Sequence, residues 1–203
     1  MTTESDQIAR LRISLDEIDP EIWRRVEVPL DLPLKSLHDV IQAVMGWEEY
    51  HLFEFRVGEK CYGIPDPDDA GFGHRVMNAK TTRLGTLVGR GVSDMEYVYD
   101  FGDYWQHRIV VEAIEQAQPD RTYPRFLDGA RRGPPEDVGS VPGYYRFIKA
   151  MASPRHRDHR RMTEWYGGPY DPEEIDEFAI RMRIGGIVKR RRAGKAAYAK
   201  RKS

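Results

Sequence analysis

Asp100, Asp103 and His107 are the residues whose types and spacing best suit chemistry in this sequence, because they lie within one short segment. Carboxylate and imidazole groups bind divalent cations, and they also exchange protons as general acids and bases. Strand alternation, however, places His107 on an apolar face, and a buried imidazole needs a hydrogen-bond partner. Asp100 or Asp103 in the adjoining turn would accept its N–H. We favour this structural His–Asp pair over a catalytic one.

Two further groups of residues could bind a metal ion. His38 and His51 flank the first expected helix, and with His107 they would form a three-histidine zinc site if all three converged on one ion at about 2.1 Å. Separate, hydrogen-bonded histidines are the other interpretation. Glu136 and Asp137 follow two prolines, and their carboxylates would either bind a cation or cap a turn. A divalent metal is the cofactor that these residues suggest.

The distribution of charge singles out the C-terminus. Residues 181–203 hold ten of the 32 Lys and Arg residues and no Asp or Glu, which leaves 22 basic against 33 acidic residues in 1–180, a net charge of −11. A basic segment on an acidic protein is typical of contact with nucleic acid or another anionic surface. The alternative is a solubilising end that folds back onto the acidic body. The predicted nucleic-acid-binding residues are Lys189, Arg190, Arg191, Arg192, Lys195, Lys200, Arg201 and Lys202.

A second basic stretch precedes the last expected helix. Basic residues beside aromatic rings suit phosphate contacts combined with base stacking. A solvated helix that offsets the acidic body would have the same composition. The stretch contains Arg155, His156, Arg157, His159, Arg160 and Arg161, and Trp165 and Tyr166 follow it.

Strands are expected where apolar and polar residues alternate. Residues 63–80 and 118–143 are rich in Pro, Gly and Asp, so we expect the first to be a long surface loop and the second to hold no element longer than a turn. Gly102 would supply a positive φ in the turn between the last two strands. The expected strands span residues 8–15, 22–28, 51–57, 95–99 and 105–113, and the first two form a hairpin.

Helices are expected where apolar residues recur at helical spacing. The first has Ser36 as its N-cap and Gly46 as its stop, and two more are expected at 144–151 and after Ser153-Pro154. The last begins with a capping box and ends at two glycines. Its residues are a start at Asp171-Pro172-Glu173-Glu174, an apolar face of Ile175, Phe178, Ala179 and Met182, and a stop at Gly185-Gly186.

The order of hairpin, helix, strands and helices predicts an α+β fold with a mainly antiparallel sheet and packed helices, of which a β-grasp-like core is one form. We expect a single domain over residues 1–186 and a basic, flexible tail over 187–203. No apolar run approaches the roughly 20 residues that span a bilayer, and residues 1–10 lack the apolar segment of a signal peptide. The single cysteine, Cys61, cannot form an internal disulfide. A cytoplasmic location without membrane contact is therefore expected.

Four segments carry a resemblance to a known family. They are Trp23-Arg24-Arg25; Leu37-His38 with Met45-Gly46-Trp47, His51-Leu52 and Phe55; Tyr97-Val98-Tyr99-Asp100-Phe101-Gly102-Asp103-Tyr104-Trp105-Gln106-His107; and Pro134-Pro135-Glu136-Asp137-Val138-Gly139. Over about residues 8–180 the chain resembles the plasmid Orf3-like family, also described as the TnpR-like passenger protein of an insertion element. The resemblance implies a role near DNA transactions and no particular reaction. Many members have cysteines where this sequence has Phe126, Gly133 and Val138, so cysteine chemistry is not expected in this region.

Three functional hypotheses follow. The leading one is a non-catalytic accessory or binding protein of mobile elements that contacts nucleic acid through the basic C-terminal segment. The second is a metal-assisted hydrolase or nuclease in which Asp100, Asp103 and His107, with Glu136 and Asp137, hold an ion that activates water. The third is a protein-interaction module that does not use the tail. The second hypothesis requires these side chains to converge in one open cleft.

Overall fold

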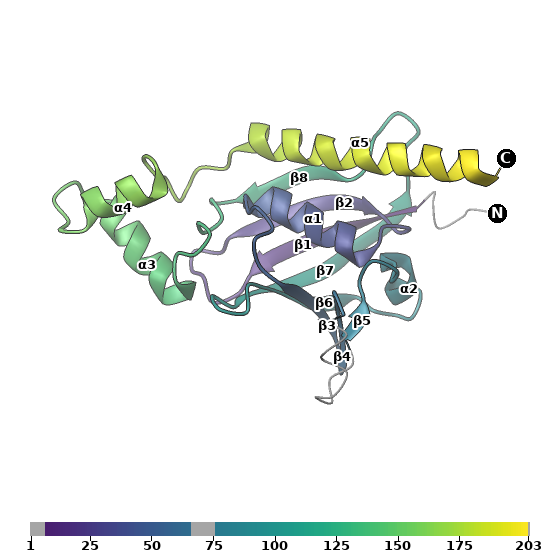
Figure 1. Cartoon of the computed structure of the whole chain (residues 1–203), viewed down its shortest axis with the longest axis horizontal. Coiled ribbons are helices and arrows are strands. Elements are labelled where there is room, and N and C mark those ends of the chain that lie inside the picture. The colour runs from purple at the N-terminus through teal and green to yellow at the C-terminus, as the bar shows by residue number, and fades with distance from the viewer. Residues whose placement is uncertain (1–6, 66–75, 203) are drawn as a thin grey trace.

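A computed structural model describes residues 7–65 and 76–202, which form one eight-stranded sheet and five helices. The strands lie in the order β5-β4-β3-β6-β7-β1-β2-β8, and β4 with β5 is the one parallel pair among them (Figure 1). The α+β prediction is confirmed, whereas a β-grasp arrangement is not shown. The strands are β1 (Gln7–Leu15), β2 (Trp23–Pro29), β3 (Phe53–Val57), β4 (Lys60–Gly63), β5 (Val76–Asn78), β6 (Asp94–Tyr99), β7 (Trp105–Gln116) and β8 (Arg125–Ala130).

The helices occupy distinct positions around this sheet. α1 lies across one face, α5 runs alongside α1, and α3 with α4 forms a helical pair at the end of the molecule opposite the C-terminus (Figure 1). None of the helices in the described part of the chain combines the length and the apolar composition that crossing a membrane requires. The helices are α1 (Leu34–Met45), α2 (Leu84–Val88), α3 (Ser140–Met151), α4 (His159–Tyr166) and α5 (Glu177–Lys202).

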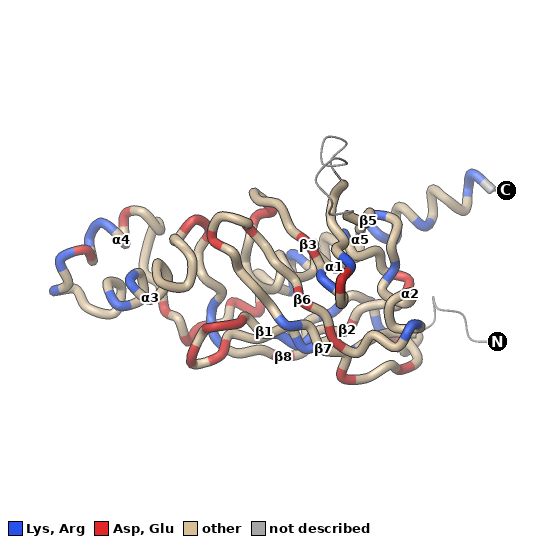
Figure 2. Tube along the Cα trace, turned by 90° about the horizontal axis from the view of Figure 1, so that it is seen from below, with Lys and Arg blue, Asp and Glu red and all other residues tan. Residues whose placement is uncertain are grey.

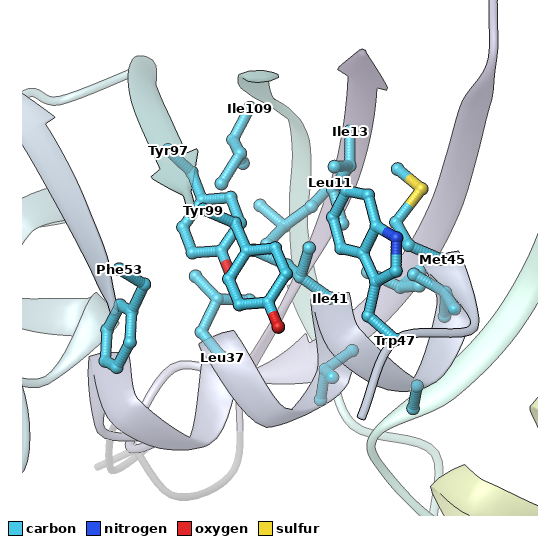
Figure 3. Close-up of a cluster of buried hydrophobic side chains, with 14 of the residues drawn as sticks. Leu11, Ile13, Leu37, Ile41, Met45, Trp47, Phe53, Tyr97, Tyr99 and Ile109 are labelled. Carbon is cyan, nitrogen blue, oxygen red and sulfur yellow. The ribbon is translucent and has the colours of Figure 1, made fainter. Parts of the chain in front are cut away.

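The core lies between α1 and the sheet, where Leu37 and Ile41 of α1 face Leu11 and Ile13 of β1 and Ile109 of β7 (Figure 3). All five side chains are inaccessible to solvent. Alternation along β1 directs every second side chain to this face, and burial of apolar surface, at about 25 cal/mol per Å², is the main force that holds the two layers together.

The opposite face of the sheet carries polar side chains in register. Arg10 lies opposite Glu27 across the β1–β2 hairpin, with 3.1 Å between Nη2 and Oε1, and Arg25 pairs with Glu112 at 2.7 Å. One apolar and one polar face is the pattern of an antiparallel sheet that is covered on a single side.

Several predicted elements agree with the structure. β1 and β2 form the expected hairpin, and Gly46 ends α1 with a left-handed φ of 89°. α1 starts at Leu34 instead of following Ser36, because the N–H groups of Leu34 and Lys35 donate to carbonyl oxygens of Thr82 and Ala79. Tertiary hydrogen bonds thus replace the expected side-chain cap.

The prediction that residues 118–143 hold no regular element is wrong. β8 pairs with the outer side of β2, and α3 begins at Ser140. β4, β5 and α2 were not predicted either, because each is shorter than the window over which periodicity is visible. Part of the expected surface loop, including Asp66, Asp68 and Asp69, lies outside the described residues.

The prediction for the last helix is also wrong in three respects. α5 begins at Glu177 after a turn at 171–176, and Asp176 caps it by accepting the N–H of Ala179 at 2.9 Å. The helix continues through Gly185-Gly186, so a boundary at residue 187 falls inside it. Its buried side chains are Ile180, Ile184 and Ile187, whereas Phe178 and Met182 are 77% and 63% exposed. Packing against α1, rather than the strongest apolar repeat in the sequence, fixes which face is buried.

Candidate functional site

Three loop segments meet at one end of the sheet, where Phe53 of β3, Tyr99 of β6 and Trp105 of β7 are register neighbours. The segments are residues 47–52 before β3, the turn 99–104 between β6 and β7, and the loop 134–139 before α3. Direct hydrogen bonds link the third segment to each of the others. Two of the family-like motifs therefore lie side by side although about 30 residues separate them in the chain.

His51, Asp100 and Asp137 form the cluster at this meeting point, which we call the acidic–histidine cluster. The Nε2 of His51 lies 2.9 Å from Oδ1 of Asp137 and 3.6 Å from Oδ2 of Asp100. One ligand atom from each residue lies within 4.8 Å of the others, which suits a shared cation. The Asp100 side chain is 10% exposed and that of Asp137 is 64% exposed. The cluster is therefore anchored on the protein side and open on the solvent side.

Hydrogen bonds fix Asp100 so that one of its two carboxylate oxygens points to the cluster while the other is bonded within the turn. Its N–H donates to Leu52 O at 2.9 Å, and its Oδ1 accepts the N–H of Gly102 at 2.9 Å. The remaining Oδ2 is the atom closest to His51. The positive φ expected at Gly102 is instead found at Asp100 and Tyr104, both at 57°.

Left-handed backbone conformations gather around the cluster. Asp137 has a φ of 56°, Ser140 of 63° and Glu49 of 61°, in addition to the two residues of the β6–β7 turn. A non-glycine residue in this region costs free energy and persists only where its surroundings determine it. Strain of this kind concentrates at binding and catalytic sites.

Glu136 supports the cluster from the buried side. Its Oε1 accepts the N–H of Glu48 at 2.8 Å and the hydroxyl of Tyr99 at 3.0 Å, while Oε2 lies 4.0 Å from Nε2 of His51. Burial raises the pKa of the Glu136 carboxyl. Burial and the nearby Glu136 charge also raise the pKa of Tyr99, so its hydroxyl keeps its proton and donates it. The Tyr99 hydroxyl oxygen also accepts the N–H of Tyr50 at 3.1 Å, which ties the first segment to the second.

Asp103 and Trp47 fix the loop that carries Glu136 and Asp137. Asp103 accepts the N–H of Gly139 at 3.0 Å, and the indole of Trp47 donates to Pro134 O at 2.8 Å. Gly133 lies so close to α1 that a Cβ there would collide with the carbonyl oxygen of Met45. Asp103 is thus a positioning residue for the loop and not a member of the cluster.

The expectation that His107 pairs with Asp100 or Asp103 is wrong. His107 is completely buried, and its Nδ1 lies 3.0 Å from Trp105 O and 3.3 Å from Tyr97 O. Nδ1 therefore carries the proton and donates it to backbone carbonyls, while Nε2 has no partner in the described residues. Burial lowers the pKa of His107 to about 4. The catalytic use of His107 with Asp100 and Asp103 finds no support in this geometry.

The three-histidine zinc site is not formed either. His38 is buried, its Nδ1 lies 2.8 Å from the Tyr97 hydroxyl, and its ring stacks on Phe53. Burial and the charge of Lys35 lower the pKa of His38 to about 3. Neither group of potential metal ligands in the described residues contains more than one histidine.

The second group of potential metal ligands is His38 with Asp39 and Glu49. Lys35 forms ion pairs with both Asp39 and Glu49, so the ammonium group already occupies the position between these carboxylates. This group is an ion-pair network and not a candidate cation site.

One cavity borders the acidic–histidine cluster, and a second lies beside the supporting residue Glu136. A cavity of about 430 Å³ has Glu136 in its lining and lies against α1, α4 and the start of α5. Another of about 400 Å³ includes Asp137 in its lining and lies against α3 and α4. Trp165 lines both cavities. The single open cleft that the hydrolase hypothesis requires is not formed by the predicted set: Glu136 and Asp137 line different cavities, and neither cavity is lined by Asp100, Asp103 or His107.

The predicted nucleic-acid-binding residues all lie on α5, whose C-terminal part extends past the body of the protein (Figure 2). Arg191 and Lys195 form ion pairs with Asp31, which fasten the helix to the loop between β2 and α1. Lys189, Arg190, Arg192, Lys200 and Arg201 are exposed. Part of the positive charge is therefore used to anchor the helix, and the rest faces solvent.

The fold and the site define a class: an α+β protein in which three loops at one end of a mostly antiparallel sheet form an acidic–histidine cluster. Comparison with known sequences shows that the chain belongs to the plasmid pRiA4b ORF-3-like protein family, whose sequence profile matches residues 7–178. The match ends just after the start of α5, so the basic part of that helix lies outside it.

Two relatives support this assignment. The uncharacterized protein y4hQ of Sinorhizobium fredii is 38% identical over 161 residues, which cover 79% of this chain and 81% of that protein. The crystal structure of the protein of unknown function MM3350 from Methanosarcina mazei Go1 superposes with a TM-score of 0.76 at 32% identity, covering 84% of this chain and 96% of that one. The descriptions of both relatives name no activity.

The sequence led us to group Asp100 with Glu136 and Asp137 around one ion, but it placed His51 in a different group, with His38 and His107. It missed Tyr99 and Trp47 as the residues that hold the three segments together. Both lie in the family-like segments, directly beside residues that were proposed. A polar aromatic residue next to a candidate ligand could have been recognised as a hydrogen-bonding anchor.

Proposed function

We propose that the acidic–histidine cluster binds a divalent cation and that the bound cation supports hydrolysis. The observation that carries this proposal is the convergence of His51, Asp100 and Asp137 from three separate segments onto one point. The left-handed backbone at both aspartates and the cavity that Asp137 lines add to it.

The donor set indicates which cations fit. One imidazole nitrogen and two carboxylate oxygens suit Mn²⁺ or Zn²⁺ better than Mg²⁺ or Ca²⁺, which prefer oxygen ligands alone. Three protein ligands leave coordination positions for water and substrate, as catalytic sites require. If a cation were held by these residues, it would supply Lewis acidity, which lowers the pKa of a coordinated water toward neutral pH.

The chain itself holds and orients this site. Gly102 restricts Asp100 to a single free oxygen, and Tyr99 with the backbone of Glu48 keeps the Glu136 carboxylate directed toward His51. These contacts hold the ligands before a cation binds, which reduces the ordering cost of binding.

Calorimetric titration of Mn²⁺ and Zn²⁺ into the full chain tests the proposal. We expect one site, with affinity reduced about tenfold or more in Asp100→Asn, because loss of a charged ligand weakens a cation site. The matched control is Asp120→Asn, which changes an exposed aspartate far from the cluster in sequence and without an ion pair in the described residues. Equal affinity in the wild type and in Asp100→Asn would contradict the proposal.

The charge of α5 favours a second candidate function, contact with nucleic acid by an accessory protein. No acidic residue follows Glu177 in the sequence, and exposed basic residues occur along the helix. Figure 2 shows Lys and Arg on the part of α5 that extends past the body. Phosphate contacts of this kind contribute affinity without sequence preference and weaken steeply with salt.

Binding of duplex DNA as a function of salt concentration tests this candidate. Deletion of residues 187–203 is unsuitable because it removes the buried Ile187, so we choose the double variant Lys189→Gln/Arg192→Gln. Its slope of log affinity against log salt should fall by about 0.9 for each phosphate that the variant no longer neutralises. The control Lys60→Gln/Lys80→Gln removes the same charge from exposed positions elsewhere. Equal effects of both double variants would exclude a specific role for α5.

A further inference from the structure

The helical pair α3–α4 is a second positive region that the candidate functions above do not use. Between residues 140 and 168 the chain has six Lys or Arg residues and only Asp158 and Glu164 as acidic residues. Figure 2 shows these basic residues at the end of the molecule opposite the C-terminus of α5. The basic residues are Arg146, Lys149, Arg155, Arg157, Arg160 and Arg161.

A cavity of about 400 Å³ lies where this pair meets the loop of the acidic–histidine cluster. Its lining includes two arginines, Arg146 and Arg161, two aromatic residues, Phe147 and Trp165, and the cluster residue Asp137. Two arginines and two aromatic rings thus share one cavity with a residue of the acidic–histidine cluster. An ordinary solvated helix would not have this arrangement.

The two arginines are largely available to a ligand. Arg146 is exposed and has no ion pair or hydrogen bond with any described residue. Arg161 pairs with Asp158 at 3.1 Å, a contact between neighbouring positions of one exposed helical turn. Exposed pairs of this type are worth about 0 to 1 kcal/mol, so a phosphate group could replace the carboxylate at little cost.

Trp165 provides a flat surface next to these charges. Trp165 is 48% exposed, and its ring lies nearly perpendicular to the ring of the buried Phe147 at a centroid distance of 5.7 Å. A large aromatic ring that is fixed on one side and open on the other is suited to stacking with a nucleobase.

Asp137 joins this cavity to the acidic–histidine cluster. The same residue lines the cavity and places Oδ1 2.9 Å from His51 Nε2. Phosphates held on Arg146 and Arg161 would therefore lie in a cavity that a cluster residue also lines.

We infer that the cavity binds single-stranded nucleic acid, with phosphates on Arg146 and Arg161 and a base on Trp165. The inference also names the substrate class of the proposed cation site, a phosphodiester chain. That part of it rests on the proposed function. Single strands fit better than duplexes, since an exposed ring can stack only on a base that is free of its partner strand. Acidic polypeptides would satisfy the arginines but have no flat base for Trp165.

Fluorescence anisotropy with a labelled oligo(dT) of about 15 nucleotides, measured in EDTA on the full chain, tests the inference. We expect Arg146→Gln/Arg161→Gln to lower the salt slope by about 0.7 for each phosphate that is no longer neutralised, the value for single strands. Trp165→Leu should weaken binding about fivefold or more, because one stacked base contributes at least that much. Quenching of tryptophan fluorescence by the oligonucleotide should disappear in the same variant.

The matched control is Arg155→Gln/Arg157→Gln, which removes the same charge from the same helical pair away from the cavity. Equal weakening in the two arginine double variants would overturn the inference, as would equally tight binding of poly-glutamate or of duplex DNA. Circular dichroism of each variant verifies folding. Because EDTA removes metal ions from the oligonucleotide assay, this assay is independent of the Mn²⁺ titration. Either the oligonucleotide or Mn²⁺ can therefore fail to bind while the other binds.

Discussion

Asp100 and Tyr99 are adjacent residues that do different work at the site. Asp100 presents one oxygen toward His51, while the Tyr99 hydroxyl binds Glu136 and the backbone of the 47–52 segment. A single hydroxyl thus connects all three segments, because Tyr99 itself belongs to the second. Removing it would take one hydrogen bond from the partly buried Glu136 carboxylate and one from the N–H of Tyr50, and a polar group that loses its partner costs more than the hydrogen bond itself contributes.

Tyr99→Phe should therefore lower the free energy of unfolding by about 1 to 3 kcal/mol and also weaken cation binding. Urea denaturation followed by circular dichroism measures the first effect. Tyr104→Phe is the matched control, because its hydroxyl only accepts an exposed contact from Arg56 at 2.7 Å, and its cost should stay within about 0.5 kcal/mol. Equal costs would show that the Tyr99 hydroxyl does not hold the loops together.

The buried histidines predict a dependence of stability on pH. The pKa of His38 is lowered to about 3 and that of His107 to about 4, against about 6.5 in the unfolded chain. Between pH 6.5 and about 4 the unfolded chain binds protons that the folded protein excludes, so stability falls as pH falls. The slope should approach about 1.4 kcal/mol per pH unit for each histidine.

Urea unfolding at about pH 7.5, 6.0 and 5.0 measures this slope. His38→Gln should reduce it by about half, because one of the two proton-excluding groups is removed. A wild-type stability that stays constant across this range would contradict the burial of neutral imidazoles.

For single residues, the sequence allowed burial to be predicted better than hydrogen-bond partners. Strand alternation correctly buried His107, because a period of two needs only local information. The partner of His107 was predicted wrongly, since backbone carbonyls carry no signature in the sequence. The pairing of His51 with Asp137 depends on the path of two loops, which no local pattern specifies.

At the scale of elements, α5 illustrates how tertiary packing overrides a local pattern. Phe178 and Met182 are apolar and suitably spaced, yet Ile180, Ile184 and Ile187 are the side chains that are buried. Two adjacent glycines were expected to end the helix, but helical residues continue after them and Arg191 pairs with Asp31. Contacts with α1 and with Asp31 thus compensate for the poor helix propensity of glycine.

The corrected helical face predicts opposite outcomes for two neighbouring positions. Ile184→Ala should cost about 2 to 5 kcal/mol, as truncation of a buried aliphatic side chain does. Met182→Ala should change stability by about 0.5 kcal/mol or less, because the side chain is solvent-exposed. Thermal denaturation of both variants shows which face of α5 is buried. A larger loss of stability in Met182→Ala than in Ile184→Ala would support the face expected from the sequence.

β8 was missed for a related reason. Pro124 precedes the strand and Gly129 lies inside it, so both residues suggested a loop. Gly129 is required by close approach instead, since a Cβ there would lie 2.8 Å from Trp23 O. A glycine that suggests a loop in the sequence can therefore be required for close strand pairing instead. Only the position of the partner strand distinguishes these two roles.

At the scale of the whole molecule, the net charge of −1 conceals two basic ends. α3–α4 and the C-terminal part of α5 lie at opposite ends of the protein (Figure 2), and the acidic–histidine cluster borders the first of them. We therefore expect the two ends to have different tasks: single-strand contact beside the cluster, and sequence-independent attachment through α5.

The proposed cation site requires ligands from three loops at one position. The most direct test is an anomalous difference map from crystals of the full chain grown with Mn²⁺. We predict one peak at about 2.2 Å from His51 Nε2, with Asp100 and Asp137 oxygens at similar distances. A peak at Asp39 and Glu49 instead, or no peak while His51 retains its hydrogen bond to Asp137, would contradict the proposed site.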